Sequence, residues 1–373
     1  MSKHYYIGLM SGTSLDAIDA ALVSFNADRI ELVHSLSATL PATLKTQILE
    51  LCGGTADEIE LLGKLDRELG ELFAQTALDL CRSAGISPLE IRAIGSHGQT
   101  VRHRPPDAQR SSDLAFTLQI GDPNTIAEIS GITTVADFRR RDIAAGGQGA
   151  PLVPAFHVAA FSQAGIERLI VNIGGMANIS LLKADGEVIG FDTGPGNVLM
   201  DSWIMHCQGH AFDRDGAWAQ SGKLNQDLLE TLLQDPYYAM HGPKSTGREQ
   251  FNLAQLLKAL ESLADIRPPD VQATLLELTA RSICDAIDEC SQKDSEVFIC
   301  GGGSANQALY SRIQALLADH KVTTTEALGI HPDWVEAAAF AWLAKQNIMS
   351  LAGNVPAVTG AKGPRVLGAV YPG

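Results

Sequence analysis

The sequence has few basic residues, with 28 Lys and Arg against 43 Asp and Glu, so its formal net charge is −15. Proteins bind DNA and RNA largely through lysines and arginines that neutralise phosphates. The shortage of basic residues therefore argues against a nucleic-acid partner. A nucleotide needs only a local site and stays compatible with an acidic chain.

Cysteine pairs and long apolar runs are also missing. Six cysteines are scattered along the chain and none forms a C-x-x-C pair, which is typical of a reducing compartment. No basic segment followed by an apolar run opens the chain, and no stretch reaches the roughly 18 uninterrupted apolar residues of a membrane helix. These absences predict a cytoplasmic protein without a membrane partner.

Three common site motifs are absent as well. The sequence contains no G-x-x-x-x-G-K-[ST], and no G-x-G-x-x-G after a strand with an acidic residue about 20 positions further on. The ten histidines form no H-x-x-H or H-E-x-x-H cluster. The P-loop and Rossmann folds are thus disfavoured, and we predict no metal held by a histidine cluster.

The elements that are present alternate between apolar strands, glycine-rich turns and amphipathic helices, which predicts an α/β fold. With 373 residues the chain exceeds the about 250 to 300 at which a single core stops growing, so two lobes are expected. The Gly- and Pro-rich stretch at 146–151 marks the boundary. We predict lobe I over 1–150 and lobe II over 151–373, with the C-terminal segment free to pack back on lobe I.

Periodicity and composition give more precise expectations for single elements. Helices are predicted over 57–83, 271–290, 307–313 and 334–347. Strands are predicted over 91–94, 115–120, 133–136, 169–173, 179–182, 188–191 and 296–300.

Residues 5–23 have the pattern of a strand, a glycine and hydroxyl turn, and a second apolar strand. Gly8 and Gly12 allow the backbone to turn and to approach a ligand closely. Short hydroxyl donors beside turn N–H groups form an anion-binding concavity, and this turn has them at Ser11, Thr13 and Ser14. The segment predicts a phosphate hairpin; taken alone, it also fits an ordinary hairpin turn.

Two further glycine turns follow. Residues 169–182 repeat the plan of strand, turn and strand, with Gly174 and Gly175 in the turn. A third cluster, Gly301 to Gly303, lies between an apolar strand and the helix predicted at 307–313, where backbone N–H groups and the helix dipole favour anions. Each turn alone is weak evidence. All three in this order predict a polyphosphate ligand.

Five strings resemble the motifs of the anhydro-N-acetylmuramic acid kinase family, within the superfamily of actin, hexokinase and Hsp70. They are GLMSGTSLD at 8–16, GSHGQT at 95–100, DFRRRD at 137–142, GFDTGPGN at 190–197 and GPKSTGR at 242–248. The resemblance extends from residue 6 to residue 371. It implies a two-lobed, actin-like and hexokinase-like (ribonuclease H-like) ATPase fold with a cleft between the lobes.

The resemblance also implies a reaction. Such an enzyme uses ATP and Mg²⁺ to open the 1,6-anhydro ring of 1,6-anhydro-N-acetylmuramic acid with water and to phosphorylate O6. The products are N-acetylmuramic acid 6-phosphate and ADP, and the step belongs to peptidoglycan recycling. Related kinases are often dimers, so the resemblance implies a homodimer.

Two acids match carboxylates of the family. Asp192 corresponds to the family's catalytic base, in the GFDTGPGN string near the end of a predicted strand. The alternative is that Asp192 caps the turn at 194–197. Glu336, a lone acid in an apolar helix, resembles the second carboxylate that contacts the sugar, or is a solvated acid helped by the helix dipole.

The resemblance places further sugar contacts in lobe I. His97, Gln99 and Thr100 follow a predicted strand and would meet sugar hydroxyls. Arg139, Arg140 and Arg141 would offer a guanidinium fork to the lactyl carboxylate, and Arg139 is the one named here as a sugar contact. Three adjacent arginines cannot all face one ligand, so which of them meets the carboxylate stays open, and one or two form ion pairs, for example with Asp137 or Asp142. Lys244 and Arg248 fit either a phosphate contact or a solvated loop.

For the nucleotide, the resemblance places the first hairpin along the phosphates, the second opposite, and the third glycine cluster beside the adenosine. The residues are Gly12, Thr13, Ser14, Leu15, Asp16, Ala17, Ile18 and Asp19, then Gly174 and Gly175, then Gly301, Gly302 and Gly303. Many sugar kinases carry an aspartate where this chain has Met10, which leaves the Mg²⁺ carboxylate open. Asp16 and Asp19 are candidates, or mark the solvent face of a strand.

Two other functions were weighed. Another sugar kinase of the superfamily would need only the first and third glycine motifs, and the GSHGQT and GFDTGPGN strings argue against it. A non-catalytic ATP-binding regulator would have no use for Asp192 and would need a partner-binding domain. The chain has no spare segment long enough for one.

Overall fold

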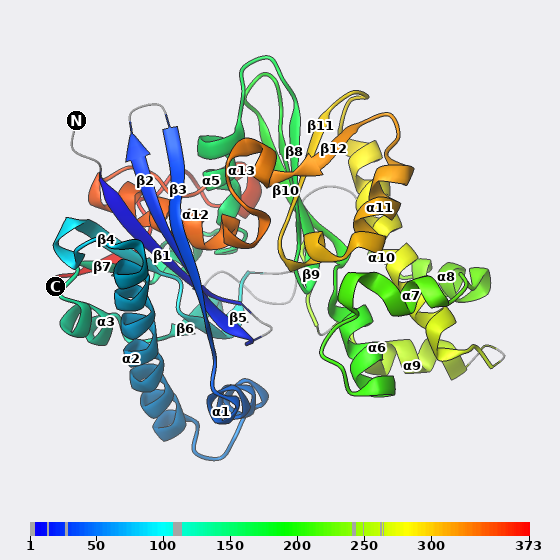
Figure 1. Cartoon of the computed structure of the whole chain (residues 1–373), viewed down its shortest axis with the longest axis horizontal. Coiled ribbons are helices and arrows are strands. Elements are labelled where there is room, and N and C mark those ends of the chain that lie inside the picture. Colours follow the sequence, from blue (N-terminus) through cyan, green and yellow to red (C-terminus); the bar gives the residue numbers. More distant parts are fainter. Residues whose placement is uncertain are drawn as a thin grey trace. The chain divides into compact units, whose positions relative to one another are not determined.

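The computed structural model describes residues 4–12, 15–26, 29–106, 114–240, 244–248, 250–261, 263 and 265–373 (Figure 1). They divide into two compact units. Unit 1 comprises Met1–Ala160 together with Trp334–Gly373, and unit 2 comprises Phe161–Asp333. Unit 1 thus extends past the boundary predicted at residue 150, and it includes the segment that follows unit 2 in the chain.

Unit 1 is built on a six-stranded sheet in the order β13-β7-β4-β1-β2-β3. Its strands are β1 (Tyr5–Ser11), β2 (Ala17–Asn26), β3 (Arg29–Thr39), β4 (Ile91–Ser96), β7 (Thr134–Ala136) and β13 (Ala369–Tyr371). β5 (Gln99–Arg104) and β6 (Phe116–Ile120) form a separate antiparallel pair. The helices are α1 (Ala42–Gly53), α2 (Glu58–Ala84), α3 (Pro123–Ser130), α4 (Phe138–Ala144), α5 (Val153–Phe161), α12 (Val335–Ile348) and α13 (Pro356–Thr359).

The sheet of unit 1 lies between α2 and α12. Ile7 and Leu9 of β1 point into one core cluster with the apolar stripe of α2. Gly8, between them, faces the opposite way, where a Cβ atom would collide with the backbone of α12 at Ala337 and Ala341. Gly8 was expected to bring backbone close to a ligand; instead it lies within β1 and allows a helix to pack directly on the sheet.

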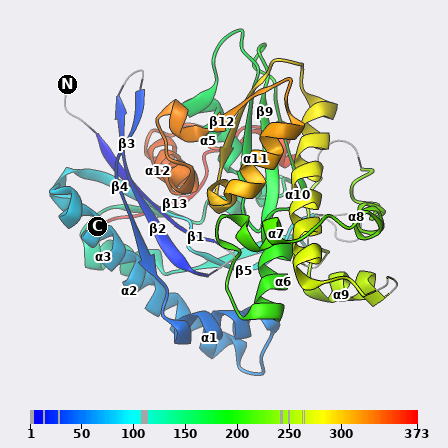
Figure 2. The same cartoon turned by 45° about the vertical axis from the view of Figure 1, so that its right-hand side comes forward.

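Unit 2 contains a five-stranded sheet in the order β10-β9-β8-β11-β12. The strands are β8 (Arg168–Ile173), β9 (Met176–Leu182), β10 (Val188–Pro195), β11 (Glu296–Cys300) and β12 (Lys321–Thr324). The helices are α6 (Val198–Gln208), α7 (Ala217–Ser221), α8 (Gln226–Leu233), α9 (Leu253–Glu261), α10 (Pro268–Cys290) and α11 (Gln307–Leu316). The long helix α10 packs against β9 and β10 (Figure 2) and contributes Leu275, Leu278 and Ile283 to the core.

The two sheets repeat one plan. In each, the first strand pairs antiparallel with the second, and the second pairs antiparallel with the third. The first strand also pairs in parallel with a fourth, and a fifth lies parallel beside that one. Among these five strands only the second is reversed, and unit 1 adds β13, antiparallel to β7. The duplicated order confirms the predicted α/β class of ribonuclease H-like ATPase folds. Within the described ranges, no helix has the length and apolar character required to cross a membrane.

Candidate active site

Asp192 lies inside β10 rather than at its end, because the strand continues to Pro195. It pairs with Asn178 of β9, and the strand register shifts between Asp192 and Gly194. Such an irregularity bends a strand and changes the direction of the side chains beside it. The fold thus places this acid at a break in regular pairing.

The groups around Asp192 come from the segments after α8. The N–H of Thr246 donates to Asp192 Oδ2 at 3.0 Å, and the N–H of Asp192 donates to the Lys244 carbonyl at 2.9 Å. The hydroxyl of Tyr237 donates to the Asp192 carbonyl at 2.7 Å. Among the described residues, the Asp192 carboxylate therefore accepts from Thr246. The alternative, in which it caps the turn at 194–197, is not the bond seen there. Lys244, proposed for phosphate or solvent, donates its Nζ to the Tyr237 carbonyl at 3.1 Å.

Burial makes Asp192 an unusually basic carboxylate. It raises the pKa of Asp192 to about 6, and the hydrogen bond from Thr246 opposes part of this rise. A carboxylate with this pKa is ionised at neutral pH and still accepts a proton readily, which suits a general base. The sequence strings contained Thr246 but gave no signal that it, or Tyr237, would contact Asp192.

The Gly174–Gly175 turn joins β8 to β9 and is bonded to the start of α6. The carbonyl of Gly174 accepts from Asn197 N at 2.8 Å, and that of Gly175 accepts from Gly196 N at 2.9 Å and Val198 N at 3.1 Å. A Cβ on Gly196 would collide with the Gly174 carbonyl. The turn is thus fixed by α6, and its contact with phosphate stays a prediction.

The three glycines at 301–303 differ in what a Cβ atom at each position would contact. Gly301 has a φ of +81°, and a Cβ there would collide with Asn172 and Ile173 of β8. A Cβ on Gly303 would collide with the Ile173 side chain, whereas one on Gly302 would meet no described atom within 4 Å. Packing accounts for Gly301 and Gly303, and only Gly302 faces open space at which a ligand fits.

The first hairpin is described only in part, since Thr13 and Ser14 lie outside the described residues. The N–H of Leu15, whose φ is +57°, donates to the Gly12 carbonyl at 3.3 Å. Asp16 is exposed and forms an ion pair with Lys45 at 2.7 Å. Ala17, Ile18 and Asp19 belong to β2; Ile18 is buried in the core, and Asp19 Oδ1 accepts from the Ser37 hydroxyl at 2.8 Å.

His97 and Arg139 meet in unit 1. His97 follows β4 and is buried; its Nδ1 donates to the Gly98 carbonyl at 2.8 Å, and its Nε2 accepts from Arg139 Nε at 3.0 Å. Arg139, from α4, also donates Nη1 to the Gly149 carbonyl at 2.8 Å. Burial, with the charge of Arg139, lowers the pKa of His97 well below its usual value. His97 is therefore neutral, with its proton on Nδ1.

Glu336 completes this cluster from the first turn of α12. Burial raises the pKa of Glu336, the charge of Arg139 opposes the rise, and the charge of Asp19 adds to it. Burial lowers the pKa of Arg139 to about 10, against the charges of Glu336 and Asp142. The structure thus brings three predicted residues together: the neutral imidazole of His97, the cation of Arg139 and the acid Glu336.

Gln99 and Thr100 lie beside this cluster at the start of β5. The hydroxyl of Ser11, the last residue of β1, donates to Gln99 Oε1 at 2.7 Å. Thr100 Oγ1 accepts from the Gln119 amide at 3.1 Å. Ser11 was singled out only as a turn hydroxyl, and its bond to Gln99 links the first hairpin to the predicted sugar loop.

Asp142 helps to position Arg139 indirectly, through Gly149, a role that the sequence did not reveal. It is fully buried, and its carboxylate accepts from Gly149 N at 2.8 Å, Asn354 Nδ2 at 2.7 Å and Thr359 Oγ1 at 2.9 Å. It therefore fixes Gly149, whose carbonyl holds Arg139. The ion pair expected in this segment forms between Arg140 and Asp137 at 3.2 Å.

Metal ligation was also considered. Over the residues that the structure describes, no group of three or more His, Cys, Asp or Glu side chains is placed to hold a metal ion. Mg²⁺ bound to a nucleotide takes most of its ligands from phosphates and water and needs only one or two carboxylates.

Comparisons with known proteins agree with the sequence strings. The family model described as Anhydro-N-acetylmuramic acid kinase matches residues 4–373. Proteins of that name from Shewanella loihica and Saccharophagus degradans are each 52% identical, over 374 and 372 residues, with 100% of both chains covered. The protein of that name from Pseudomonas paraeruginosa is 52% identical over 368 residues, with 98% of each chain covered. The predicted resemblance is confirmed.

Proposed function

The chain belongs to the anhydro-N-acetylmuramic acid kinase family, and from this premise we propose that it opens and phosphorylates 1,6-anhydro-N-acetylmuramic acid. Water and ATP are consumed, and N-acetylmuramic acid 6-phosphate and ADP are formed, as a step of peptidoglycan recycling. The enzyme is thus a phosphotransferase. The observation that carries the proposal is Asp192, a partly buried carboxylate whose pKa is raised to about 6.

Asp192 acts as the general base in this proposal. Its carboxylate takes a proton from water while the water oxygen forms a bond to the anomeric carbon of the sugar. The bond from that carbon to O6 breaks, and O6 attacks the γ-phosphorus of ATP as the bond to the bridging oxygen of ADP breaks. Positioning and a base of matched pKa are what such a coupled step asks of the protein.

The cluster in unit 1 would bind the sugar. Arg139 donates hydrogen bonds from Nε and Nη1, and among the described residues its Nη2 has no hydrogen-bond partner. Nη2 is therefore the atom that would meet the lactyl carboxylate. Glu336 would accept a hydrogen bond from a sugar hydroxyl. Gln99 and Thr100 would contact further hydroxyls, and neutral His97 holds Arg139 in place.

ATP would lie along the glycine turns at 12–19, 174–175 and 301–303, and Gly302 offers the open space beside the adenosine. When bound, Mg²⁺ supplies positive charge to the phosphate oxygens. Asp16, which pairs with Lys45, and Asp19, which accepts from the Ser37 hydroxyl, are the candidates to hold it or its waters. The charge of Asp19 also contributes to the raised pKa of Glu336.

The surroundings of the enzyme are part of the proposal. The scattered cysteines support a cytoplasmic location, and the family resemblance supports a homodimer. Light scattering of the purified protein tests the second point, and a mass of one chain, about 39.7 kDa, would contradict it.

The test of function is ADP release with Mg-ATP and four sugar conditions: the anhydro sugar, N-acetylmuramic acid, glucose and none. We expect turnover only with the anhydro sugar. Turnover with glucose would favour another sugar kinase of the superfamily. Slow ADP release indifferent to every sugar would contradict the proposal and favour a non-catalytic ATP-binding regulator.

A further inference from the structure

The hydrogen bonds around Asp192 close into a ring, called here the Asp192 ring. Tyr237 donates its hydroxyl to the Asp192 carbonyl at 2.7 Å and its N–H to Asp235 Oδ1 at 2.9 Å. Gln250 Nε2 donates to the same Oδ1 at 2.9 Å, and Gln250 Oε1 accepts from the Thr246 hydroxyl at 3.0 Å. The Thr246 N–H returns to Asp192 Oδ2 at 3.0 Å.

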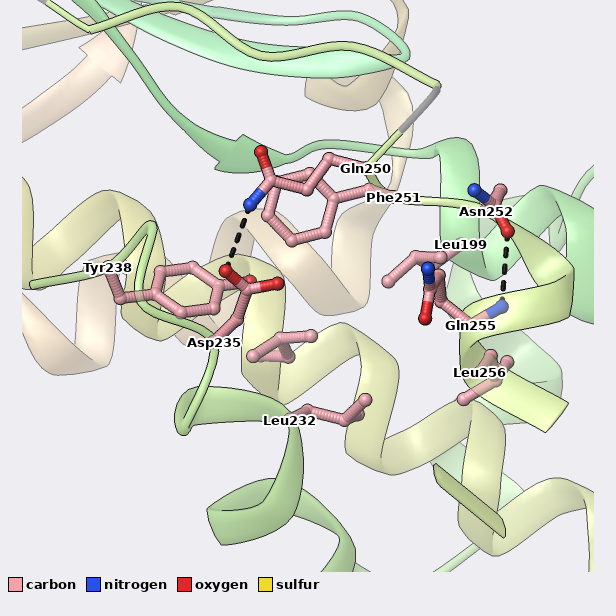
Figure 3. A pocket seen from close by; sticks show the side chains of 10 residues that line it. Leu199, Leu232, Asp235, Tyr238, Gln250, Phe251, Asn252, Gln255 and Leu256 are labelled. Carbon is pink, nitrogen blue, oxygen red and sulfur yellow. Dashed lines mark hydrogen bonds between the residues drawn. The ribbon is translucent and has the colours of Figure 1, made fainter. Parts of the chain in front are cut away.

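The far side of the ring lies in the wall of a small cavity. Figure 3 shows the Gln250 amide pointing at the Asp235 carboxylate, with the rings of Tyr238 and Phe251 beside them. The cavity is about 50 Å³, and its lining also includes Asn252, Gln255 and leucines from four helices, Leu199, Leu232, Leu256 and Leu278. Polar bonds in such apolar surroundings are stronger than in water, and an unpaired polar group there is costly.

The ring matters because the segment that carries Thr246 has no regular structure of its own. Residues 244–247 belong to no helix or strand. The direction of the Thr246 N–H is therefore not set by a backbone ladder. Its hydroxyl bond to Gln250 is the side-chain link that ties this residue, through Asp235, to the segment just after α8.

We infer that Gln250 and Asp235 are positioning residues, which hold the Thr246 N–H on the Asp192 carboxylate and thereby set how readily Asp192 takes a proton from water. The inference rests on the proposed function for the meaning of that proton transfer. The geometry itself does not depend on it. Gln250 suits the role because its amide both accepts from Thr246 and donates to Asp235, whereas a glutamate would meet the Asp235 carboxylate without a proton.

Several charged and titratable groups lie in or beside the Asp192 ring. They are Asp235, Tyr237, Tyr238 and Lys244, all from the segments that follow α8. The variant that isolates the inference must therefore leave these four unchanged, and Gln250→Ala does so.

The experiment is a carboxyl ¹³C NMR titration of protein labelled at aspartate, with the Asp192 signal identified by its loss in Asp192→Asn. We expect a midpoint near the value of about 6 in the wild type. In Gln250→Ala the midpoint should rise by about half a unit to one unit, because a hydrogen bond to the ionised form is weakened. Gln255→Ala is the matched control, since Gln255 lines the same cavity and its side chain takes no part in the ring.

Turnover is measured on the same variants across pH. With Gln250→Ala, the acidic limb of kcat should move to higher pH by the same amount, while the KM for ATP stays unchanged. Asp235→Asn keeps the accepting oxygen and should preserve most of the wild-type profile, whereas Asp235→Ala should behave like Gln250→Ala. A folded Gln250→Ala protein with the wild-type midpoint would overturn the inference, even if its kcat fell at every pH.

Thr246→Val covers the case in which Gln250→Ala does not fold. It removes the hydroxyl bond to Gln250 and retains both the N–H and the side-chain shape, so the same rise is expected. The two claims also fail separately. Unchanged midpoints with sugar-dependent turnover would refute the positioning role alone, and shifted midpoints without any such turnover would refute the proposed function alone.

Discussion

Glu336 in unit 1 and Asp192 in unit 2 are both acids whose pKa is raised by burial, yet their neighbours differ. Glu336 lies near Arg139, a buried cation whose charge opposes the rise. For Asp192, the described residues supply only the neutral N–H of Thr246 as the opposing group. An acid beside a buried cation suits binding, because the cation offsets part of the cost of burying its charge. An acid whose opposing group is one neutral donor suits proton transfer.

The largest effect that this contrast predicts is at Asp192. Asp192→Asn keeps the shape and an oxygen for the Thr246 N–H but removes the base, so sugar-dependent turnover should fall by about 10³-fold. Steady-state ADP release measures it. Asp215→Asn, an exposed change of the same kind in unit 2, should retain full activity. Comparable losses in both variants would mean that the assay reports unit 2 as a whole and not its base.

The second prediction concerns the cation of unit 1. Arg139→Gln removes the charge that faces Glu336 and weakens the bonds to His97 and Gly149, so kcat/KM for the sugar should fall about 100-fold. Most of the loss should be in KM. Arg140→Gln, next along the chain but exposed and paired with Asp137, should change kcat/KM by less than about twofold. A loss of kcat with unchanged KM would place Arg139 at the chemical step and break the contrast.

A smaller effect is expected when the acid of unit 1 is made neutral. Glu336→Gln retains the shape and can still bind a hydroxyl, so the KM for the sugar should rise about tenfold with kcat largely kept. The exposed helical acid Glu128 in the same unit offers a matched control, Glu128→Gln. If Glu336→Gln abolished turnover as fully as Asp192→Asn, the two acids would share the chemistry.

The smallest effect is on stability. The pKa of Asp192 is about 6 in the folded chain against an ordinary 3.8, so at pH 7.5 the folded state carries a charge that its site resists. Stability is lost as pH rises from 3.8 to 6, and Asp192→Asn should be about 1 kcal/mol more stable than the wild type at pH 7.5. Urea unfolding measures it, and the difference should vanish at pH 3.5.

Hydrophobic spacing predicted the elements that are buried on one face or on both. The predicted helices over 57–83, 271–290 and 334–347 correspond to α2, α10 and α12, and the strand over 296–300 matches β11. Strand β3 was missed because it lies at the sheet edge and is mostly half-buried, so its sequence RIELVHSLSAT has no apolar run. β13, three residues long, gives no local signal at all.

The site was predictable only where the family resemblance named its residues. His97 and Arg139 lie in family strings, Glu336 resembles the family's second carboxylate, and the structure joins the three. The supports of these residues come from distant parts of the chain: Asp142 is bonded to Asn354, 212 positions away, and Ser11 to Gln99, 88 positions away. A contact between such distant residues leaves no pattern in a single sequence, since each partner looks locally like any polar residue.

The packing of α12 on Gly8 and Gly95 has a consequence for biosynthesis. The helix belongs to a segment that a ribosome makes only after all of unit 2. Its backbone packs on the face of β1 and β4 where Gly8 and Gly95 have no side chains. The N-terminal sheet must therefore emerge with that face uncovered, while unit 2 is free to fold as it is made. Glu336 arrives with the same helix, so a nascent chain lacks this member of the proposed sugar site until translation is nearly finished.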